Sequence, residues 1–138
     1  MSIKNLAVNF NLHGHPVPAV RDVSFSINAG ETVALVGESG SGKSVTSQAI
    51  MGILPQSASI SSGEILFADP NNNGQITDIA ALDPNSKAIR QIRGGRISII
   101  FQEPMTSLSP VHKIGDQISE ALFLHRDFSQ AEGMELTQ

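Results

Sequence analysis

Gly37-Glu38-Ser39-Gly40-Ser41-Gly42-Lys43-Ser44 is the stretch of sequence that decides the fold. It matches the pattern G-x-x-x-x-G-K-[ST], which forms a phosphate-binding loop when a buried strand precedes it and a helix follows it. The apolar run Thr-Val-Ala-Leu-Val at 32–36 precedes it, and a segment with helical apolar periodicity follows it. The pattern in this setting predicts a binding site for a nucleoside triphosphate.

Each residue type in this stretch has a physical reason. The glycines permit backbone conformations that a Cβ forbids, and they let main-chain N–H groups approach a phosphate closely. The first N–H groups of the following helix add to the same anion site. Lys43 supplies a mobile positive charge for the β- and γ-phosphates, and the Ser44 hydroxyl supplies a ligand for Mg²⁺. The alternative is a glycine-rich turn that binds no ligand. This alternative is weak, because the full pattern rarely occurs by chance between a strand and a helix.

Composition narrows the class of protein. The 138 residues suffice for one domain of ordinary size, and 40% of them are apolar. The net charge of -4 gives no electrostatic indication of nucleic-acid binding. We read the local basic group of Lys87, Arg90, Arg93 and Arg96 as a solvated helix face. Cysteine is absent, and no apolar stretch approaches the roughly 18 residues of a membrane span, so we expect a soluble chain.

Two alternating strands are expected before the loop. Apolar residues alternate with others over 6–10 and again over 23–27. Between them, 11–18 is rich in breakers and predicts a loop, while 28–31 predicts a turn into a buried strand over 32–36. This order suggests a small antiparallel layer beside a buried parallel sheet.

The residues after the loop predict further helices and strands. Helices are expected over 43–54 (ended by Pro55), over 83–93 (with Asp83 as N-cap) and from Ile114 to His125. Strands are expected over 65–67 and 97–101, and a polar surface turn over 69–74. Ser129 and Glu132 form a capping-box pattern that opens one more helix.

Gln102 is the second candidate site residue, because it directly follows the apolar strand expected over 97–101. Ligand contacts in α/β sheets gather at the carboxyl ends of core strands. Gln102 could therefore approach Mg²⁺ or the attacking water at the γ-phosphate. On the local pattern alone, a polar residue that simply ends a strand is an equally good reading.

These residues together carry a family resemblance. Residues 34–46, which read Ala-Leu-Val-Gly-Glu-Ser-Gly-Ser-Gly-Lys-Ser-Val-Thr, resemble the ATP-binding subunits of ABC transporters. Residues 99–108, which read Ile-Ile-Phe-Gln-Glu-Pro-Met-Thr-Ser-Leu, resemble the Q-loop region of the subfamily that imports di- and oligopeptides, glutathione and nickel. The resemblance covers about 6–132. It implies an α/β fold with a P-loop NTPase core, in which a parallel sheet has a small antiparallel β layer at the N-terminus, here incomplete.

The resemblance also implies roles for individual residues. It assigns the phosphates to the loop and the start of its helix: Gly37, Glu38, Ser39, Gly40, Ser41, Gly42, Lys43, Ser44 and Val45. It makes Lys43 and Gln102 the catalytic contacts within this chain, with Ser44 and Gln102 on Mg²⁺. Phe10 is the candidate for stacking on adenine. Ser109 stands where this subfamily commonly has Asn. Residues 1–105 would form the β layer and phosphate-loop core, and 106–138 the start of a helical subdomain.

The family pattern contains parts that these 138 residues lack. There is no apolar run followed by Asp-Glu, no Leu-Ser-Gly-Gly-Gln signature and no matching switch His. We therefore expect an ABC-type transport ATPase by family, with this chain as it stands catalytically incomplete. The implied ligands are ATP and Mg²⁺. The implied partners are transmembrane permease subunits and a second ATP-binding subunit, at the inner face of a bacterial membrane.

Two other readings of the sequence stay open to test. The chain could act as a truncated, non-catalytic fragment that binds nucleotide or occupies a partner surface. A small kinase or GTPase with the same loop fits poorly, because an N-K-x-D guanine motif is absent. We also expect marginal stability, since half of a sheet would leave an unpaired edge and exposed apolar side chains over 97–101.

Overall fold

The computed structural model describes residues 1–102 and 108–125. These residues belong to two compact units, 1–90 and 91–138, and each is described here by itself. The capping-box helix expected from Ser129, and the part of the Q-loop motif at 103–107, lie outside the described residues.

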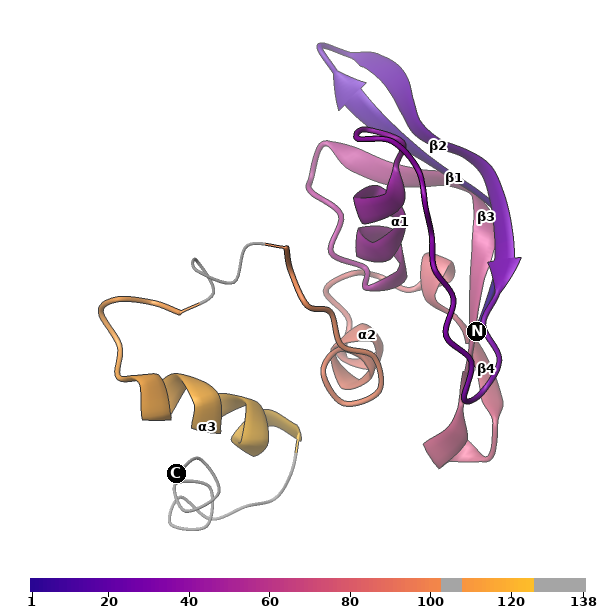
Figure 1. Cartoon of the computed structure of the whole chain (residues 1–138). Coiled ribbons are helices and arrows are strands. Elements are labelled where there is room, and N and C mark those ends of the chain that lie inside the picture. The colour runs from indigo at the N-terminus through magenta and orange to yellow at the C-terminus, as the bar shows by residue number, and fades with distance from the viewer. Residues whose placement is uncertain (103–107, 126–138) are drawn as a thin grey trace. The chain divides into compact units, whose positions relative to one another are not determined.

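The first unit is built on an antiparallel sheet of four strands (Figure 1). The strands are β1 (Ser2–Leu12), β2 (His15–Ser26), β3 (Ala58–Asp69) and β4 (Gln75–Asp78), in the order β2-β1-β3-β4. The sheet confirms the antiparallel layer expected at the N-terminus. It contains the strands predicted over 65–67 and 6–10, and nearly all of the strand predicted over 23–27.

A bulge in β1 changes which residues reach the core. Between the pairs Lys4–Glu64 and Ala7–Ser62, two residues of β1 lie opposite the single residue Gly63 of β3. Asn5, one of the two, takes a left-handed φ of 49°. The extra residue shifts the alternation by one position, so Ile3 is buried together with Leu6 and Val8.

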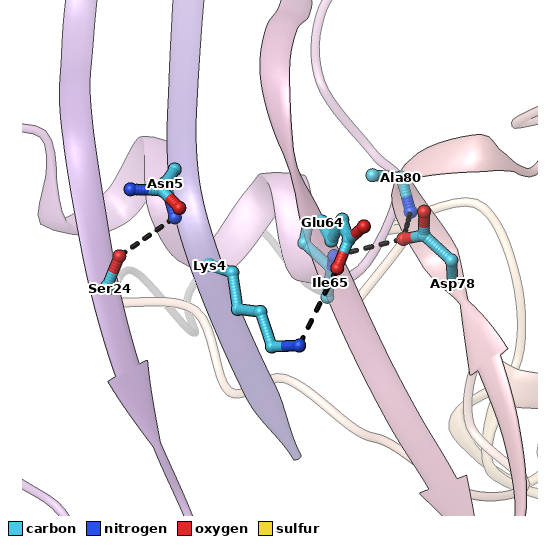
Figure 2. A network of polar contacts seen from close by, with 7 residues as sticks. All are labelled: Lys4, Asn5, Ser24, Glu64, Ile65, Asp78 and Ala80. Atoms are coloured by element: carbon cyan, nitrogen blue, oxygen red, sulfur yellow. Dashed lines mark hydrogen bonds and ion pairs between the residues drawn. The ribbon is translucent and has the colours of Figure 1, made fainter.

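Polar contacts hold the bulged strand to its neighbours (Figure 2). The Asn5 N–H donates to the Ser24 hydroxyl of β2 at 2.8 Å, and its side-chain amide donates to the Asp22 carboxylate at 2.7 Å. On the other side, the Lys4 ammonium lies 3.8 Å from the Glu64 carboxylate of β3. Both charged side chains are exposed, so this ion pair adds little stability.

Helix α1 (Lys43–Ile50) covers the face of the sheet that carries the core residues (Figure 1). Thr46 and Ala49 are its buried residues, and they lie one turn apart. The helix contacts β1, β2 and the short 3₁₀ helix η2 (Ile79–Ala81). The core of this unit is therefore a small apolar layer, listed here in chain order: Ile3, Leu6, Val8, Val20, Ala49, Met51, Ile65, Ile79 and Ile89.

The Asp78 side chain joins β3 to η2. One carboxylate oxygen accepts hydrogen bonds from the Ile65 N–H at 2.9 Å and from the Ala80 N–H at 3.0 Å (Figure 2). Another 3₁₀ helix, η1 (Pro70–Asn72), lies in the expected polar turn, where the Asp69 carboxylate accepts from the Asn71 N–H.

The described residues contain two further α-helices. Helix α2 covers Lys87–Ile92, and helix α3 covers Ile114–His125, which confirms the third predicted helix. Within the described residues, no helix has both the length and the hydropathy needed to cross a membrane.

The two predicted core strands over 32–36 and 97–101 are wrong for this structure. Both segments are irregular apart from an isolated bridge at Ile97, and their apolar side chains are largely exposed. Val36 is 88% exposed and Ile100 is 96% exposed. A strand needs a neighbouring strand for its backbone groups, and within residues 1–102 and 108–125 neither run belongs to a pair of strands, since the contact of Ile97 with Arg93 is a single bridge. The predicted parallel sheet is accordingly not formed by the described residues.

Three other boundaries differ from the prediction. The loop expected over 11–18 is a hairpin whose turn is His13-Gly14, and its prolines lie in the edge strand β2, where a missing N–H is tolerated. Helix α1 ends before Pro55, because Gly52 (φ 62°) closes a Schellman motif with the bond from the Ile53 N–H to the Gln48 carbonyl. Asp83 caps a turn at 83–86, and α2 begins after it.

Candidate functional site

The stretch 37–44 connects an exposed coil to the first turn of α1 (Figure 1). Residues 28–31 form the predicted turn, in which the Glu31 carboxylate accepts from both nitrogens of Asn28. The coil then leads to Gly37, and the Ser41 N–H donates to the Glu38 carbonyl at 3.2 Å to close a tight turn. The helix begins at Lys43, as the sequence predicts.

The glycines of the stretch are needed for two different reasons. Gly40 has a φ of 80° with open space around it, so only the backbone conformation favours glycine there. Gly42 has a φ of 89°, and a Cβ at this position would lie 2.6 Å from the Ala19 carbonyl oxygen of β2. Gly42 therefore lets the loop lie directly against the sheet, beside Val20.

Gly42 is also the N-cap residue of α1, and it has no side chain with which to cap the helix. The first N–H groups of a helix have no acceptor within the helix. The first turn of α1 contains no acidic residue either. The helix N-terminus thus presents donors and the positive end of its dipole next to the loop, which is the arrangement that binds phosphate oxygens.

The Lys43 side chain folds back over its own loop. Its ammonium donates to the Gly37 carbonyl at 2.8 Å, to the Glu38 carbonyl at 2.7 Å and to the Ser41 hydroxyl at 3.2 Å. These three acceptors use all three N–H groups of the ammonium. The positive charge therefore lies against the loop at Gly37, Glu38 and Ser41. A bound phosphate would compete with these three acceptors for the ammonium.

Ser44 differs from the other hydroxyl residues of α1. The Thr46 hydroxyl donates to the Gly42 carbonyl at 3.0 Å, and the Ser47 hydroxyl donates to the Lys43 carbonyl at 3.3 Å. The exposed Ser44 hydroxyl has no such bond to another described residue. A free hydroxyl at this position fits the predicted role as a Mg²⁺ ligand, since Mg²⁺ prefers oxygen ligands.

Phe10 lies on the same sheet face as the core residues of β1. It follows Val8 by two positions, and it is paired with Val17 on one side and Ala58 on the other. Val8 is paired with Val20, the residue next to which Gly42 lies. The half-buried Phe10 ring therefore lies two positions further along β1 toward the hairpin turn than Val8, whose partner Val20 lies beside Gly42.

Gln102 lies in the second unit and is exposed. Its predicted approach to the phosphate loop stays a prediction, because the loop belongs to the first unit. The preceding segment contains one local contact, in which the Gly94 N–H donates to the Ile97 carbonyl at 2.8 Å.

Two contacts of the site were not predicted from the sequence. The Ser41 hydroxyl contacts the Lys43 ammonium, and the Ala19 carbonyl sets the space available at Gly42. Ser41 belongs to the loop pattern, but the pattern assigns no role to its side chain. The contact of Gly42 with Ala19 has no signal in the sequence, because 11–18 predicts a loop and no element is predicted over 19–22.

The comparison with protein families identifies one match. Residues 20–136 match the family described as ABC transporter. This range includes the whole phosphate-loop pattern and Gln102 and covers most of the chain.

Curated relatives share nearly half of the aligned residues. A Brucella ovis protein named for peptide import and ATP binding is 49% identical over 136 residues, which are 98% of this chain and 39% of that protein. The dipeptide transport ATP-binding protein DppD of Bacillus subtilis is 50% identical over 131 residues, 94% of this chain and 36% of the relative. The glutathione import ATP-binding protein GsiA of Salmonella typhimurium is 43% identical over 135 residues, which are 97% of this chain and 21% of that protein. The chain thus spans well under half the length of these relatives.

Solved structures with a similar fold include the ATP-binding cassette MJ0796. Its dimeric post-hydrolysis state bound to ADP and Pi gives a TM-score of 0.77 at 22% identity, covering 99% of this chain and 53% of that chain. A second dimeric structure of the same cassette gives a TM-score of 0.74 at 24% identity. At this level of identity the likeness establishes the fold, and it agrees with the predicted ABC ATPase core.

Proposed function

This chain belongs to the ABC transporter family, and we propose that it forms part of the ATP-binding component of an importer for peptides or glutathione. The observation that carries the proposal is the loop geometry: a Lys43 ammonium held at a glycine loop that ends on an uncapped helix N-terminus. The names of the relatives support the substrate class, since they refer to peptide, dipeptide and glutathione import.

The proposed nucleotide contacts use groups that fit a triphosphate. The backbone N–H groups at Gly40–Val45 would donate to phosphate oxygens, and Lys43 would exchange its carbonyl partners for the β- and γ-phosphates. Ser44 would hold Mg²⁺, which neutralises the phosphate charge when bound. Gln102 would contact Mg²⁺ and the attacking water. Together these groups orient the γ-phosphate and stabilise its charge, which is how phosphoryl-transfer sites work.

The proposed partners follow from the family. The chain would act at the inner face of a bacterial membrane, with transmembrane permease subunits and a second ATP-binding subunit. We propose that the 138 residues alone bind ATP without turning it over. Support comes from these 138 residues, which contain no apolar run followed by Asp-Glu and no signature motif. Phosphate release from Mg-ATP tests this, and release above background that is lost in Lys43→Ala would contradict it.

The Ser44 assignment can be tested by its magnesium dependence. Ser44→Ala should weaken ATP binding about tenfold in the presence of Mg²⁺, roughly the value of one bond to a charged group, and should have little effect in EDTA. Isothermal titration calorimetry measures both conditions. Ser47→Ala is the matched control, because it removes a hydroxyl one turn of the same helix further on that is bonded to a carbonyl. Equal losses with and without Mg²⁺ would contradict the assignment.

The Phe10 assignment predicts a contribution from the base alone. Phe10→Ala should weaken the binding of ATP by about 1–3 kcal/mol, the usual contribution of a base stacked on an aromatic ring. Binding of inorganic triphosphate should not change, because that ligand lacks a base. Phe25→Ala, at a half-buried position of β2 paired with Ile3, controls for general damage to the sheet. A parallel loss for both ligands would refute the stacking role.

A further inference from the structure

The turn that joins β3 to β4 (Figure 1) contains an exposed asparagine whose side chain is not held in place. Asn73 is the one asparagine of the 138-residue sequence that is followed by glycine, Gly74. Within the described residues, the side-chain amide of Asn73 bonds to no protein group. The amide of the preceding Asn72, by contrast, donates to the side chain of Gln75. The Asn73 amide is therefore accessible to water and to the backbone that follows it.

An asparagine that precedes glycine is open to attack by its own backbone, because glycine has no Cβ to hinder the approach of its nitrogen. The Gly74 nitrogen would give up its proton to hydroxide and form a bond to the side-chain carbon Cγ of Asn73. The bond from Cγ to Nδ2 would then break, and Nδ2 would take up a proton and leave as ammonia. Water would open the resulting cyclic succinimide at either of its carbonyls, which gives aspartate or isoaspartate. In sum, an amide and water become a carboxylic acid and ammonia, and the reaction needs no oxidant or reductant.

The fold of the turn restrains this reaction at the attacking nitrogen. The Gly74 N–H donates to the Asp69 carbonyl at 2.9 Å, and the Asp69 carboxylate, the N-cap of η1, accepts from the Asn71 N–H at 2.9 Å. Asn73 (φ 50°, ψ 30°) and Gly74 (φ 73°) both have a left-handed backbone conformation. The bond to Asp69 must open before the Gly74 nitrogen can lose its proton and turn toward Cγ. Such an opening is local, because the turn is exposed and leads into the edge strand β4.

We propose that Asn73 is a site of deamidation, at which aspartate or isoaspartate forms at a rate set by the opening of the turn. Either product adds a negative charge to a turn that already contains Asp69. Isoaspartate also places the side-chain methylene group in the main chain, which disturbs the bond from Gly74 to Asp69 and the adjoining strand pair of Asp69 with Gln75. The inference is independent of the proposed function, since the turn does not belong to the phosphate loop.

Peptide mapping by mass spectrometry, with separation of aspartate from isoaspartate, tests the proposal on the 138-residue chain. Samples of the wild type, Asp69→Ala and Asp83→Ala are aged at neutral and at mildly alkaline pH, and the wild type is also aged in urea as the fully open reference. Asp83 is the matched control for Asp69, because its carboxylate also accepts a bond within a turn, from the Asn85 N–H at 2.9 Å. Asn85 is the internal control for reactivity, since it is exposed like Asn73 but is followed by serine.

The expected result separates the modification site from the control that the turn exerts on it. In the folded wild type, acid should accumulate faster at Asn73 than at Asn85, and faster at the higher pH, because the attacking nitrogen must lose a proton. Asp69→Ala should raise the rate at Asn73 about fivefold, the typical effect of losing one cap, whereas Asp83→Ala should leave it unchanged.

Two results would overturn the proposal. One is a folded chain that forms no acid at Asn73, or forms it no faster than at Asn85, under conditions in which the chain in urea reacts at Asn73. The other is an equal rate at Asn73 in Asp69→Ala and Asp83→Ala, which would show that opening of the turn does not set the rate.

Discussion

At the scale of single residues, the two units depend on a few groups with several partners. Lys43 bonds to three acceptors of its own loop, Asp78 accepts from two backbone N–H groups, and Gln117 makes three bonds to one turn. Such groups fix backbone geometry more than isolated surface pairs do, because removing one of them leaves several partners without a bond.

Gly63 and Gly74 provide a test of the bulged sheet at the residue scale. Both have a positive φ, of 96° and 73°, so alanine at either position carries the cost of about 1–2 kcal/mol for a left-handed backbone. At Gly63 alone, a Cβ would lie 2.5 Å from the Asn5 carbonyl oxygen and 2.6 Å from the Leu6 Cα. The residue at 74 has open space.

Gly63→Ala should therefore lower the free energy of unfolding by about 2 kcal/mol more than Gly74→Ala, since backbone atoms at such contacts must shift. Urea unfolding of the two variants and the wild type measures the difference. Equal losses would mean that β1 and β3 can separate at the bulge without strain.

At the scale of elements, apolar spacing predicted α1 and the alternating parts of β1 and β3, which bury one face. It also predicted α3, although Ile114 and Ile118 of that helix are exposed. The bulge could not be predicted, because an extra residue at Asn5 breaks the period of two and hides Ile3 from the pattern. Strand β4 was missed, since its four residues carry a single large apolar side chain, Ile76.

The two apolar runs show why a strand cannot be inferred from hydrophobicity alone. Residues 32–36 and 97–101 have the composition of fully buried strands, which requires strands on both sides and cover on both faces. Within the described residues they have neither, and they are irregular. The tight turn at 38–41 and the start of α1 at Lys43 agree with the predicted loop, because they depend on local glycines, whereas the phosphate contacts stay a prediction. The packing of Gly42 against Ala19 could not be predicted, because it depends on the position of β2.

At the scale of the whole molecule, the exposed apolar runs dominate the expected behaviour in solution. Ile100 is 96% exposed, and Phe101 beside it is also exposed. Unpaired apolar segments with β-branched residues favour association between chains. We therefore expect the 138-residue chain to self-associate at micromolar concentration.

Ile100→Lys should reduce this self-association, because it places a charge in the middle of the apolar run. Ile76→Lys is the control, since Ile76 is also exposed (66%) but stands between the polar residues Gln75 and Thr77. Sedimentation velocity over a concentration series measures both variants. A wild-type chain that stays monomeric, or an equal effect of the two substitutions, would show that the run at 97–101 does not drive association.

The central claim is that the loop at 37–44 binds the triphosphate of ATP through Lys43. The most direct measurement is a calorimetric titration of the chain with Mg-ATP, in parallel with Lys43→Ala and Lys87→Ala. Lys43 has three bonds within the loop, whereas Lys87 is an exposed residue of α2. We predict binding to the wild type and to Lys87→Ala, and a loss of about tenfold or more in Lys43→Ala, as expected for bonds between charged groups. Absence of binding in the wild type, or equal binding by all three chains, would contradict the account.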